Sequence, residues 1–384
     1  MILLKNGKLI SPDPEGKKDI LLSGGTIAGI SETIEPPAGI ETESVDFEGL
    51  LVLPGLIDGH VHFAGAGGEG GPSTRTPEMP VSDIVEGGVT TAVGMLGTDG
   101  ITRAVESVLM KARSLSAQGI TAYILSGAYQ VPTPTITGDL GRDITLISEV
   151  IGAGEIAVSD HRDSVPQWHE LARLIRTVRV AGMLAGKAGI VCVHLGEAPR
   201  TFEILLEVVE KANIPWRNIL PTHCNRSEAV FELAVDYARR GGFVDITTSA
   251  YPFFPDEEAK PSSCIGKLLA SGVPSHRISL SSDAGGSLPE FDEAGNLTGY
   301  EIGKVSTIYS EIVDLVTKEN MPINQAVRFA TSNPAAVYGL RNKGRVAAGC
   351  DADLLVIDEK YEIQHVIAGG RFLIRDKLNT DSLG

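Results

Sequence analysis

The sequence predicts an α/β protein whose main part is a (β/α)8 TIM barrel and whose two termini together build a small β-sandwich domain. Two observations lead to this prediction. In the middle of the chain, short apolar runs of strand type alternate eight times with helix-type segments, as in a parallel barrel. At both ends, short apolar runs alternate with Gly and Pro, which is typical of the strands of a small sheet.

The two terminal segments carry similar short strands. We expect amino-terminal strands at residues 2–4, 20–22, 26–30 and 50–53. We expect carboxyl-terminal strands at residues 352–357, 364–368 and 369–374, the last two forming a hairpin on Gly369 and Gly370. Residues 1–54 and 341–384 are therefore predicted to form the small β domain, and residues 55–340 the barrel.

The central segment supplies the barrel strands. They are expected at residues 56–62, 90–96, 121–127, 155–160, 189–196, 218–224, 243–249 and 278–283. Helical patterns lie at residues 101–118, 165–185, 200–212, 227–240, 305–318 and 323–331. Because the chemistry of such barrels lies at the carboxyl ends of the strands, the residues that end each run are the candidates for function.

Composition and charge disfavour several classes of protein. The chain has 384 residues, 42% of them hydrophobic, which is enough for one large core and a smaller second one. The 49 acidic and 33 basic residues give a net charge of -16, which disfavours nucleic acid or an anionic membrane as a partner. Residues 1–7 lack the features of a signal peptide, and no run approaches the roughly 18 apolar residues of a membrane span. Four cysteines without paired spacing indicate a cytoplasmic protein.

Histidines end three of the expected strands. The first strand ends in His60 and His62, whose side chains point the same way because they are two residues apart. The fifth ends in His194, the sixth in His223 and the eighth in Asp283. An isolated His-x-His is most often a surface pair, but four histidines and an aspartate at one barrel mouth are hard to explain as packing. They predict two divalent metals, one on the first pair of histidines and one on the second.

The fourth expected strand supplies carboxylates, Glu155 and Asp160. A carboxylate from this strand would bridge the two metals. A two-metal site can hold a bridging hydroxide at neutral pH and polarise a carbonyl group. Asp283 would then be left to move protons.

These strand-end residues resemble the amidohydrolase superfamily, whose members also carry a small β domain built from both chain ends. A closer resemblance is to the metallo-type β-aspartyl peptidases, the isoaspartyl dipeptidase family. The motifs that carry it are GGEGGPSTRTPE (67–78), LGTD (96–99), SGAY (126–129), SDHR (159–162), PTHCNR (221–226) and SSDAGGS (281–287). The resemblance therefore extends through nearly the whole chain.

The resemblance also implies roles for the loop residues of these motifs. Glu69 would hold the free α-amino group of a β-linked aspartate, and Thr98 would line the same pocket. Tyr129 would stabilise the developing oxyanion on the scissile carbonyl. Carboxylates of the substrate would be held by Arg162, Arg226 and Ser287. The chemistry agrees, because one ammonium and two carboxylates call for one acid and two planar guanidinium groups.

One position departs from the family pattern. The family usually bridges its metals with a lysine carboxylated on its amine, but the matching position here is Glu155, and no lysine lies between Lys111 and Lys187. Some amidohydrolase relatives use glutamate as the bridge, so we expect Glu155 in this role. Its shorter side chain must draw the metals or the strand inwards, or leave one metal weakly bound. Asp160 is the fallback ligand, although its place before His161 and Arg162 suits support of the substrate loop.

The resemblance thus implies a binuclear zinc-type peptidase that hydrolyses β-aspartyl dipeptides, with Asp283 as general base and acid. It also implies a homo-oligomer, of which an octamer is one form. Two alternatives stay open. The first is another amidohydrolase, either a dihydroorotase- or hydantoinase-like cyclic amidase or an N-acyl amino acid deacylase; Glu69 discriminates, because a substrate without a free amine needs no such acid. The second is a non-catalytic amidohydrolase-like scaffold, which a degraded ligand set would have favoured.

Overall fold

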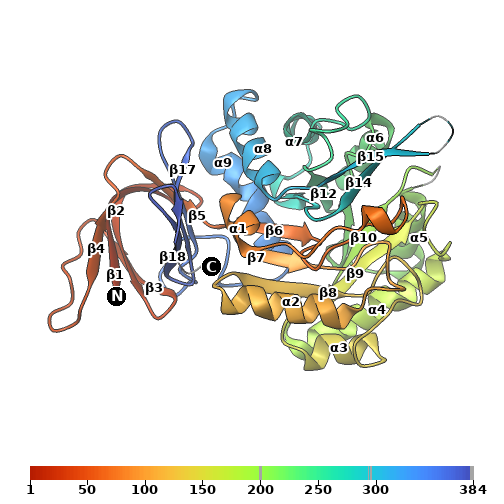
Figure 1. Ribbon diagram of the computed structural model, residues 1–384, viewed down its shortest axis with the longest axis horizontal. Helices are drawn as coiled ribbons and strands as arrows, with labels where there is room; N and C mark the ends of the chain where they lie inside the picture. The colour runs from red at the N-terminus through yellow and green to blue at the C-terminus, as the bar shows by residue number, and fades with distance from the viewer. Residues whose placement is uncertain (199–200, 293, 295, 381–384) are drawn as a thin grey trace.

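The computed structural model describes residues 1–198, 201–292, 294 and 296–380, and its central feature is a barrel of parallel strands (Figure 1). The strands are β6 (Leu56–Val61), β7 (Val89–Gly94), β8 (Thr121–Ser126), β9 (Val150–Val158), β10 (Ile190–Leu195), β11 (Ile219–Thr222), β12 (Val244–Thr247) and β13 (Ile278–Ser281). Strands β6 to β11 form one sheet in chain order, and β12 pairs with β13. Three main-chain hydrogen bonds join these sheets: Cys224 N–H donates to Asp245 (3.2 Å), His62 N–H to Ala284 (2.7 Å) and Asp283 N–H to His60 (3.0 Å). The expected barrel is therefore confirmed.

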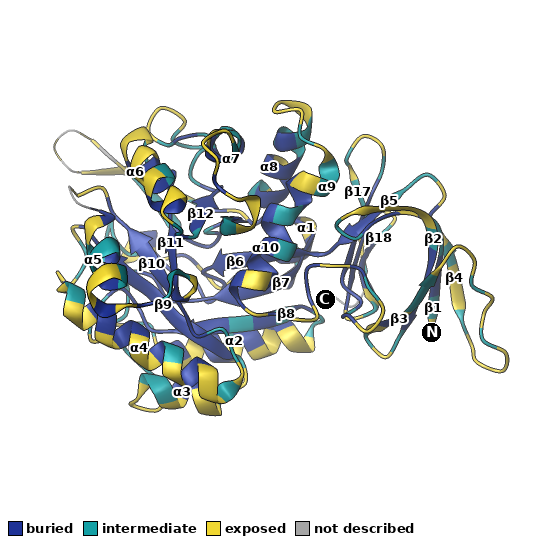
Figure 2. Cartoon of the chain, turned by 180° about the vertical axis from the view of Figure 1, so that it is seen from behind, coloured by how far each residue is buried: buried dark blue, intermediate teal, exposed yellow. Residues whose placement is uncertain are grey.

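Seven of the eight barrel strands are buried along their whole length, and β8 is buried except at Thr121 and Tyr123; Figure 2 shows this burial by the dark colour of the strands. Parallel strands covered on both faces are apolar throughout rather than alternating. The expected start of the fourth strand at residue 155 is wrong, since β9 begins at Val150. Gly152 and Gly154 interrupt its apolar pattern, and a Cβ at Gly152 would lie 2.2 Å from the Ile190 carbonyl oxygen. Close approach of β10 therefore requires glycine there, and Glu155 lies inside the strand rather than at its start.

Helices cover the outside of the barrel, with exposed outer faces on α3 and α4 (Figure 2). Five follow the expected patterns: α2 (Val105–Ala117), α4 (Trp168–Ala185), α5 (Glu203–Ala212), α6 (Glu228–Arg239) and α8 (Ser306–Thr317). Residue 200, the expected start of the α5 segment, lies outside the described residues. The expected helix at 323–331 is divided into α9 (Ile323–Ala326) and a 3-10 turn, Val327–Ala330. Several elements are not predicted by the sequence patterns: α1 (Val81–Glu86), α3 (Leu140–Leu146), α7 (Pro261–Ala270), α10 (Ser332–Val337) and the hairpin of β14 (Ser287–Phe291) and β15 (Leu297–Ile302).

The two chain ends share one mixed sheet beside the barrel, drawn in red and dark blue in Figure 1. Its strands are β1 (Ile2–Ile10), β2 (Pro14–Ser23), β3 (Thr26–Ser31), β4 (Glu43–Asp46), β5 (Leu51–Pro54), β16 (Leu354–Ile357), β17 (Ile363–Ala368), β18 (Arg371–Arg375) and β19 (Leu378–Asn379). The ends meet where β5 pairs antiparallel with β16. The expected hairpin on Gly369 and Gly370 is confirmed, and both glycines have the positive φ of a tight hairpin turn (53° and 73°). A separate apolar core, including Leu9, Val52 and Val356, lies within this sheet.

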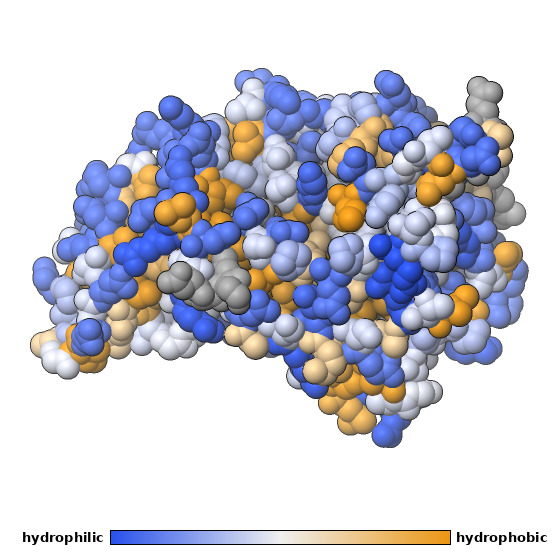
Figure 3. Space-filling view, viewed as in Figure 1, coloured by the Kyte–Doolittle hydropathy of each residue, from blue (hydrophilic) through white to orange (hydrophobic). Residues whose placement is uncertain are grey.

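The surface agrees with the acidic composition. On the face drawn in Figure 3, hydrophilic residues are spread widely and apolar residues form small patches between them. No helix in the described part of the chain combines the length and the apolar character that a membrane crossing requires.

Candidate active site

A cluster of histidines and carboxylates lies at the carboxyl ends of the barrel strands. His60 lies on β6 with His62 directly after it, Glu155 lies on β9, and His194 lies on β10. His223 and Asp283 follow β11 and β13. The structure thus brings together all six residues that the sequence analysis expected as metal ligands.

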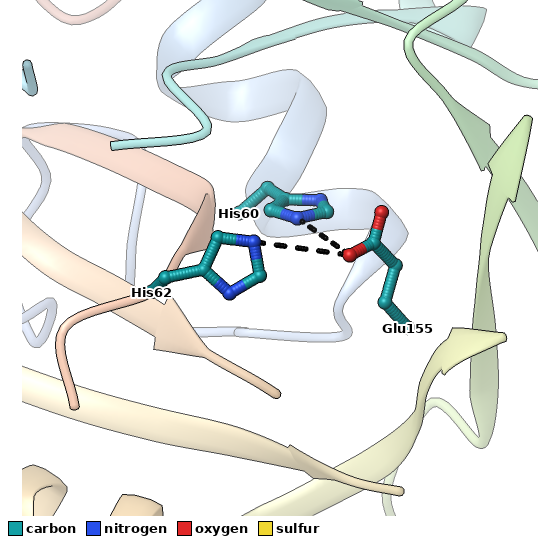
Figure 4. Close-up of side chains that lie close together, drawn as sticks. All are labelled: His60, His62 and Glu155. Carbon is teal, nitrogen blue, oxygen red and sulfur yellow. Dashed lines mark ion pairs between the residues drawn. The ribbon is translucent and has the colours of Figure 1, made fainter. Parts of the chain in front are cut away.

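The first half of the cluster contains His60, His62 and Glu155 (Figure 4). The two Nε2 atoms lie 3.5 and 3.8 Å from Glu155 Oε2. Ligand atoms that share a metal at about 2.1 Å lie roughly 3 to 4 Å apart, so these separations suit a common cation. Moreover, His60 Nε2 and Glu155 Oε2 are buried without a hydrogen-bond partner among the described residues, which is costly unless a ligand binds there. The residues therefore fit a divalent metal.

The second half shares Glu155 with the first. Its other oxygen, Oε1, lies 2.6 Å from His194 Nδ1 and 2.8 Å from His223 Nε2. Glu155, His194 and His223 form a second group whose ligand atoms all lie within 4.8 Å of one another. One carboxylate with an oxygen facing each histidine pair is the arrangement that a bridging ligand needs.

The electrostatics of the cluster favour a bound cation. Burial opposes the charge on Glu155, but the surrounding histidines hold the pKa of its carboxyl well below the usual range. Burial also disfavours a charged imidazole, yet the Glu155 carboxylate raises the pKa of His60 well above its usual value. Burial lowers the pKa of His223 to about 4, which leaves this ring neutral and able to ligate. The negative charge at Glu155 therefore attracts positive charge to His60.

Backbone and neighbouring groups hold the ligands in position. The Met95 carbonyl oxygen lies 3.1 Å from His62 Nδ1, which leaves Nε2 free to face the cluster. His223 and Asp283 both have a positive φ of 59°, a conformation that side-chain-bearing residues rarely adopt. Such strain is concentrated at functional sites, where the surrounding fold enforces it.

Asp283 has the most exposed side chain of the cluster. Its side chain is 23% exposed, whereas those of His60 and Glu155 are 2% and 1% exposed. Its Oδ1 lies 3.1 Å from His62 Nε2 and 3.6 Å from His60 Nε2. Burial opposes its ionisation, but the nearby histidines lower the pKa of Asp283 to about 2. An ionised carboxylate at this position can accept a proton from a group in the cavity.

The cluster forms the floor of a cavity of about 690 Å3. Every expected substrate-binding residue lines it: Glu69, Thr98, Arg162, Arg226 and Ser287. Three of their polar atoms are buried without a partner among the described residues, namely Glu69 Oε2, Arg226 Nε and Ser287 Oγ. Groups left unpaired in this way are available to a polar ligand.

Arg162 and Tyr129 are held close to the floor. Asp160 accepts two hydrogen bonds of 2.8 Å from the Arg162 guanidinium, and it lies 3.0 Å from His194 Nε2. Asp160 therefore orients its neighbours, in agreement with the expected support of the substrate loop. The Tyr129 hydroxyl lies 2.8 Å from His194 Nδ1, and burial raises the pKa of Tyr129 well above its usual value. At neutral pH this phenol remains a hydrogen-bond donor.

The cavity is also lined by polar residues that the sequence does not predict: Glu197, Thr247, Glu257, Glu258, Glu290 and Thr298. Among the four acids of this group, Glu258 is the least exposed. Its Oε2 is buried and has no hydrogen-bond partner among the described residues. A signal was present, because Glu258 lies in the segment that follows the seventh barrel strand, where function was expected. However, the acidic run at residues 256–258 is typical of a solvated loop.

Comparison with known proteins places this site in a family. The model of the amidohydrolase family matches residues 143–373. The chain belongs to the amidohydrolase family. The matched amidohydrolase segment contains four of the six expected metal ligands, and the metal-type cluster is consistent with the metal dependence of this family.

Within this family the similarities differ in strength. A β-aspartyl dipeptidase structure from the thermophilic, keratin-degrading Fervidobacterium islandicum AW-1, in complex with the β-Asp-Leu dipeptide, is 42% identical, with a TM-score of 0.93, over 99% of this chain and 97% of that chain. A dihydroorotase of Streptococcus pyogenes serotype M3 is 24% identical over 94% of this chain and 91% of its own length. A D-hydantoinase structure from Thermus sp. is 18% identical, with a TM-score of 0.71, over 99% of this chain and 96% of that chain. The last similarity concerns the fold alone.

Proposed function

We propose that this chain is a metal-dependent hydrolase that cleaves β-aspartyl (isoaspartyl) dipeptides. The observation that carries the proposal is the 42% identity, over 99% of the chain, with a β-aspartyl dipeptidase in complex with β-Asp-Leu. The two cyclic amidases compared above are much less similar, with 24% identity for the dihydroorotase and 18% for the D-hydantoinase. This difference favours the dipeptidase over the cyclic-amidase alternative.

The charges of the cavity support this substrate class. A β-aspartyl dipeptide carries a free α-ammonium on the aspartate and two carboxylates, one on each residue. Glu69 is the acid for the ammonium, and Arg162 and Arg226 are the guanidinium groups for the carboxylates. Ser287 donates a further hydrogen bond to a carboxylate, and Thr98 lines the same pocket. The unpaired atoms of Glu69, Arg226 and Ser287 support these roles.

The cluster would hold two divalent metals, of which zinc is the element that we propose. His60 and His62 would ligate one, His194 and His223 the other, with Glu155 between them and Asp283 beside the first pair. The two groups of donors that share Glu155 support this division. When bound, such cations would lower the pKa of a water molecule in the cavity and would polarise a carbonyl group.

Two side chains of the protein, Asp283 and Tyr129, would take part in the reaction alongside the metals. Asp283, ionised and partly exposed, accepts the proton of the attacking water and transfers it to the leaving amine. Tyr129, protonated at neutral pH, donates a hydrogen bond to the oxyanion that develops on the carbonyl oxygen. The products are free aspartate and the released amino acid.

The same proposal includes the domain division, the assembly and the location. Residues 1–54 and 341–384 would form the β-sandwich domain, of which residues 381–384 lie outside the described part, and residues 55–340 the catalytic barrel. An apolar core made only of residues from the two terminal segments supports this division. We propose a homo-oligomer built partly through the terminal sheets, an octamer being one form. A cytoplasmic location is supported by the four cysteines, all of which are buried and free.

The test is elemental analysis of protein purified without chelator, with hydrolysis of β-Asp-Leu assayed on the same sample. We expect about two metals per chain together with turnover, since each half of the cluster has its own histidine pair. Glu155→Gln removes the bridging charge but keeps the side-chain volume, and it is expected to lower both the metal content per chain and the turnover of β-Asp-Leu. Two metals without turnover would contradict the substrate, whereas one metal with ordinary turnover would contradict the bridging role of Glu155.

A further inference from the structure

Glu258 lies on the wall of the cavity next to Arg226. It belongs to the segment between β12 and α7, and its main-chain N–H donates to the Phe254 carbonyl oxygen (3.0 Å). Asn225 makes two hydrogen bonds with the main chain of Ala259 and so holds this segment in place. The Asn225 side chain donates to the Ala259 carbonyl oxygen (3.1 Å), and the Ala259 N–H donates to the Asn225 carbonyl oxygen (2.9 Å). Since Arg226 follows Asn225 and Glu258 precedes Ala259 in the chain, these hydrogen bonds also hold Arg226 and Glu258 near each other.

Glu258 is half-buried, and one of its two carboxyl oxygens, Oε2, is buried without a hydrogen-bond partner among the described residues. Burial raises the pKa of Glu258 to about 8; Arg226 opposes this rise, and the negative charges of Asp283, Glu197 and Glu257 add to it. A carboxyl group in such surroundings gains from a ligand that brings a positive charge.

A β-aspartyl dipeptide whose second residue is neutral has no group that would pair with Glu258. A β-aspartyl dipeptide with a neutral second residue has one ammonium and two carboxylates, and Glu69, Arg162 and Arg226 already match them. Glu258 is therefore one acid more than this substrate needs. Glu197, Glu257 and Glu290 line the same cavity and strengthen its negative potential. The additional group that fits Glu258 is a cation.

The position of Glu258 in the cavity indicates which residue of the dipeptide would carry this cation. Glu69 lies 3.5 Å from Arg162, so the aspartyl ammonium would bind on the side of the β6 and β9 loops. Glu258 is fixed to the Arg226 segment instead, on the side of the β11 and β12 loops. The cluster lies between these two sides, because its residues come from the ends of β6, β9, β10, β11 and β13, and the scissile bond of the proposed substrate would lie over it. The cation consequently belongs to the residue that is released.

We propose that Glu258 binds a cationic side chain on the residue that follows the isoaspartyl bond, so that β-aspartyl dipeptides of Lys or Arg are preferred substrates. This inference rests on the proposed function and specifies its substrate class. Arg226 would bind the terminal carboxylate of that residue, while Glu258 beside it would bind the side-chain ammonium or guanidinium. The two neighbouring groups would thus recognise the two opposite charges of one basic amino acid.

The decisive experiment compares kcat/KM for β-Asp-Lys with kcat/KM for β-Asp-Lys acetylated on its Nζ, with β-Asp-Leu as the reference substrate. Acetylation removes the charge but keeps the aliphatic stem. We expect a preference of about tenfold or more for the charged dipeptide, which is the size of effect of one charge-assisted hydrogen bond. Glu258→Gln should reduce this ratio to near one, and Glu258→Asp should restore part of it. Asp256→Asn, the same loss of charge two residues away and outside the cavity wall, should leave the ratio unchanged.

The outcomes separate this inference from the proposed function. Absence of β-Asp-Leu hydrolysis by the metal-loaded protein would contradict the proposed function itself. Ordinary β-Asp-Leu hydrolysis with a charged-to-acetylated ratio below about twofold would overturn the role of Glu258 alone, since charge recognition of this kind is worth more. An undiminished ratio in Glu258→Gln would do the same. Because the wild-type ratio needs no variant, the inference is testable even where Glu258→Gln does not fold.

Discussion

The floor and the rim of the cavity are built in different ways. The floor consists of residues on or directly after barrel strands, with side chains between 1% and 5% exposed: His60, His62, Glu155, His194 and His223. The rim consists of loop residues, among them Glu69 and Arg162, which are 18% and 24% exposed. The strands therefore fix the donor atoms of the floor, whereas the rim depends on loops that the barrel leaves free to vary.

This difference suggests that the floor determines the type of reaction and the rim determines which substrate is bound. Residues of the floor contact one another at 2.6 to 3.8 Å and form groups that fit cations. Several residues of the rim, like His60 and Glu155 of the floor, have buried polar atoms that no described residue satisfies, but the rim residues lie on loops around the cavity. Substitutions in the floor should therefore abolish chemistry on every substrate, and substitutions in the rim should change which substrate is used.

The largest effect is expected for Asp283→Asn, at the border of floor and rim. This variant keeps the side-chain volume but removes the group that accepts and returns the proton, so kcat on β-Asp-Leu should fall by about 10³-fold. Steady-state kinetics on protein with verified metal content and unchanged circular dichroism measures this effect. Ordinary turnover in such a sample would remove Asp283 from the mechanism.

A smaller loss is expected for Tyr129→Phe. Without the hydroxyl, the oxyanion loses one donor, and kcat should fall by about 10²-fold while KM changes little. Metal content is the necessary control, because the Tyr129 hydroxyl lies 2.8 Å from His194 Nδ1. A change in KM alone would assign Tyr129 to the rim rather than to catalysis.

Glu69→Gln tests the rim directly. Loss of the charged partner of the substrate ammonium should lower kcat/KM for β-Asp-Leu by about tenfold to a hundredfold, mainly through KM. The same variant assayed on N-acetyl-β-Asp-Leu, which has no ammonium, should show a much smaller difference from wild type. Equal losses on both substrates would mean that Glu69 supports the loop instead of binding the amine.

The floor was largely predictable from the sequence because its residues follow a rule of the fold. Four histidines and Asp283 end apolar runs, and parallel strands bring their carboxyl ends to one mouth. Glu155 was identified although the start of its strand was not, since Gly152 and Gly154 interrupt the pattern of β9. Lys187, the first lysine after Glu155, is engaged away from the cluster, because its Nζ donates to the carbonyl oxygens of Ile144, Ile147 and Val150.

The rim and the short elements were less predictable. Glu69, Thr98 and Tyr129 were identified only through resemblance, because loops have no periodicity from which a side-chain direction follows. Glu258 was missed, since an acid within an acidic run is typical of a solvated loop. Helix α3 has seven residues, too few for a clear apolar period, and the β14–β15 hairpin exposes much of its surface. Their positions depend on packing against the barrel.

The smallest effect is expected for Thr98→Ala, which removes one hydroxyl from a half-buried position of the rim and leaves the floor intact. A single neutral hydrogen bond contributes about 1 kcal/mol, so KM for β-Asp-Leu should rise by about fivefold with kcat nearly constant. Thr98→Ser retains the hydroxyl and should remain close to wild type, which separates hydrogen bonding from packing of the methyl group. A fall in kcat instead would show that the LGTD loop also positions the floor, since a Cβ at the adjacent Gly97 would lie 3.1 Å from the His62 ring. In that case the loop after β7, which contains Thr98, would contribute both to catalysis at the floor and to substrate selection at the rim.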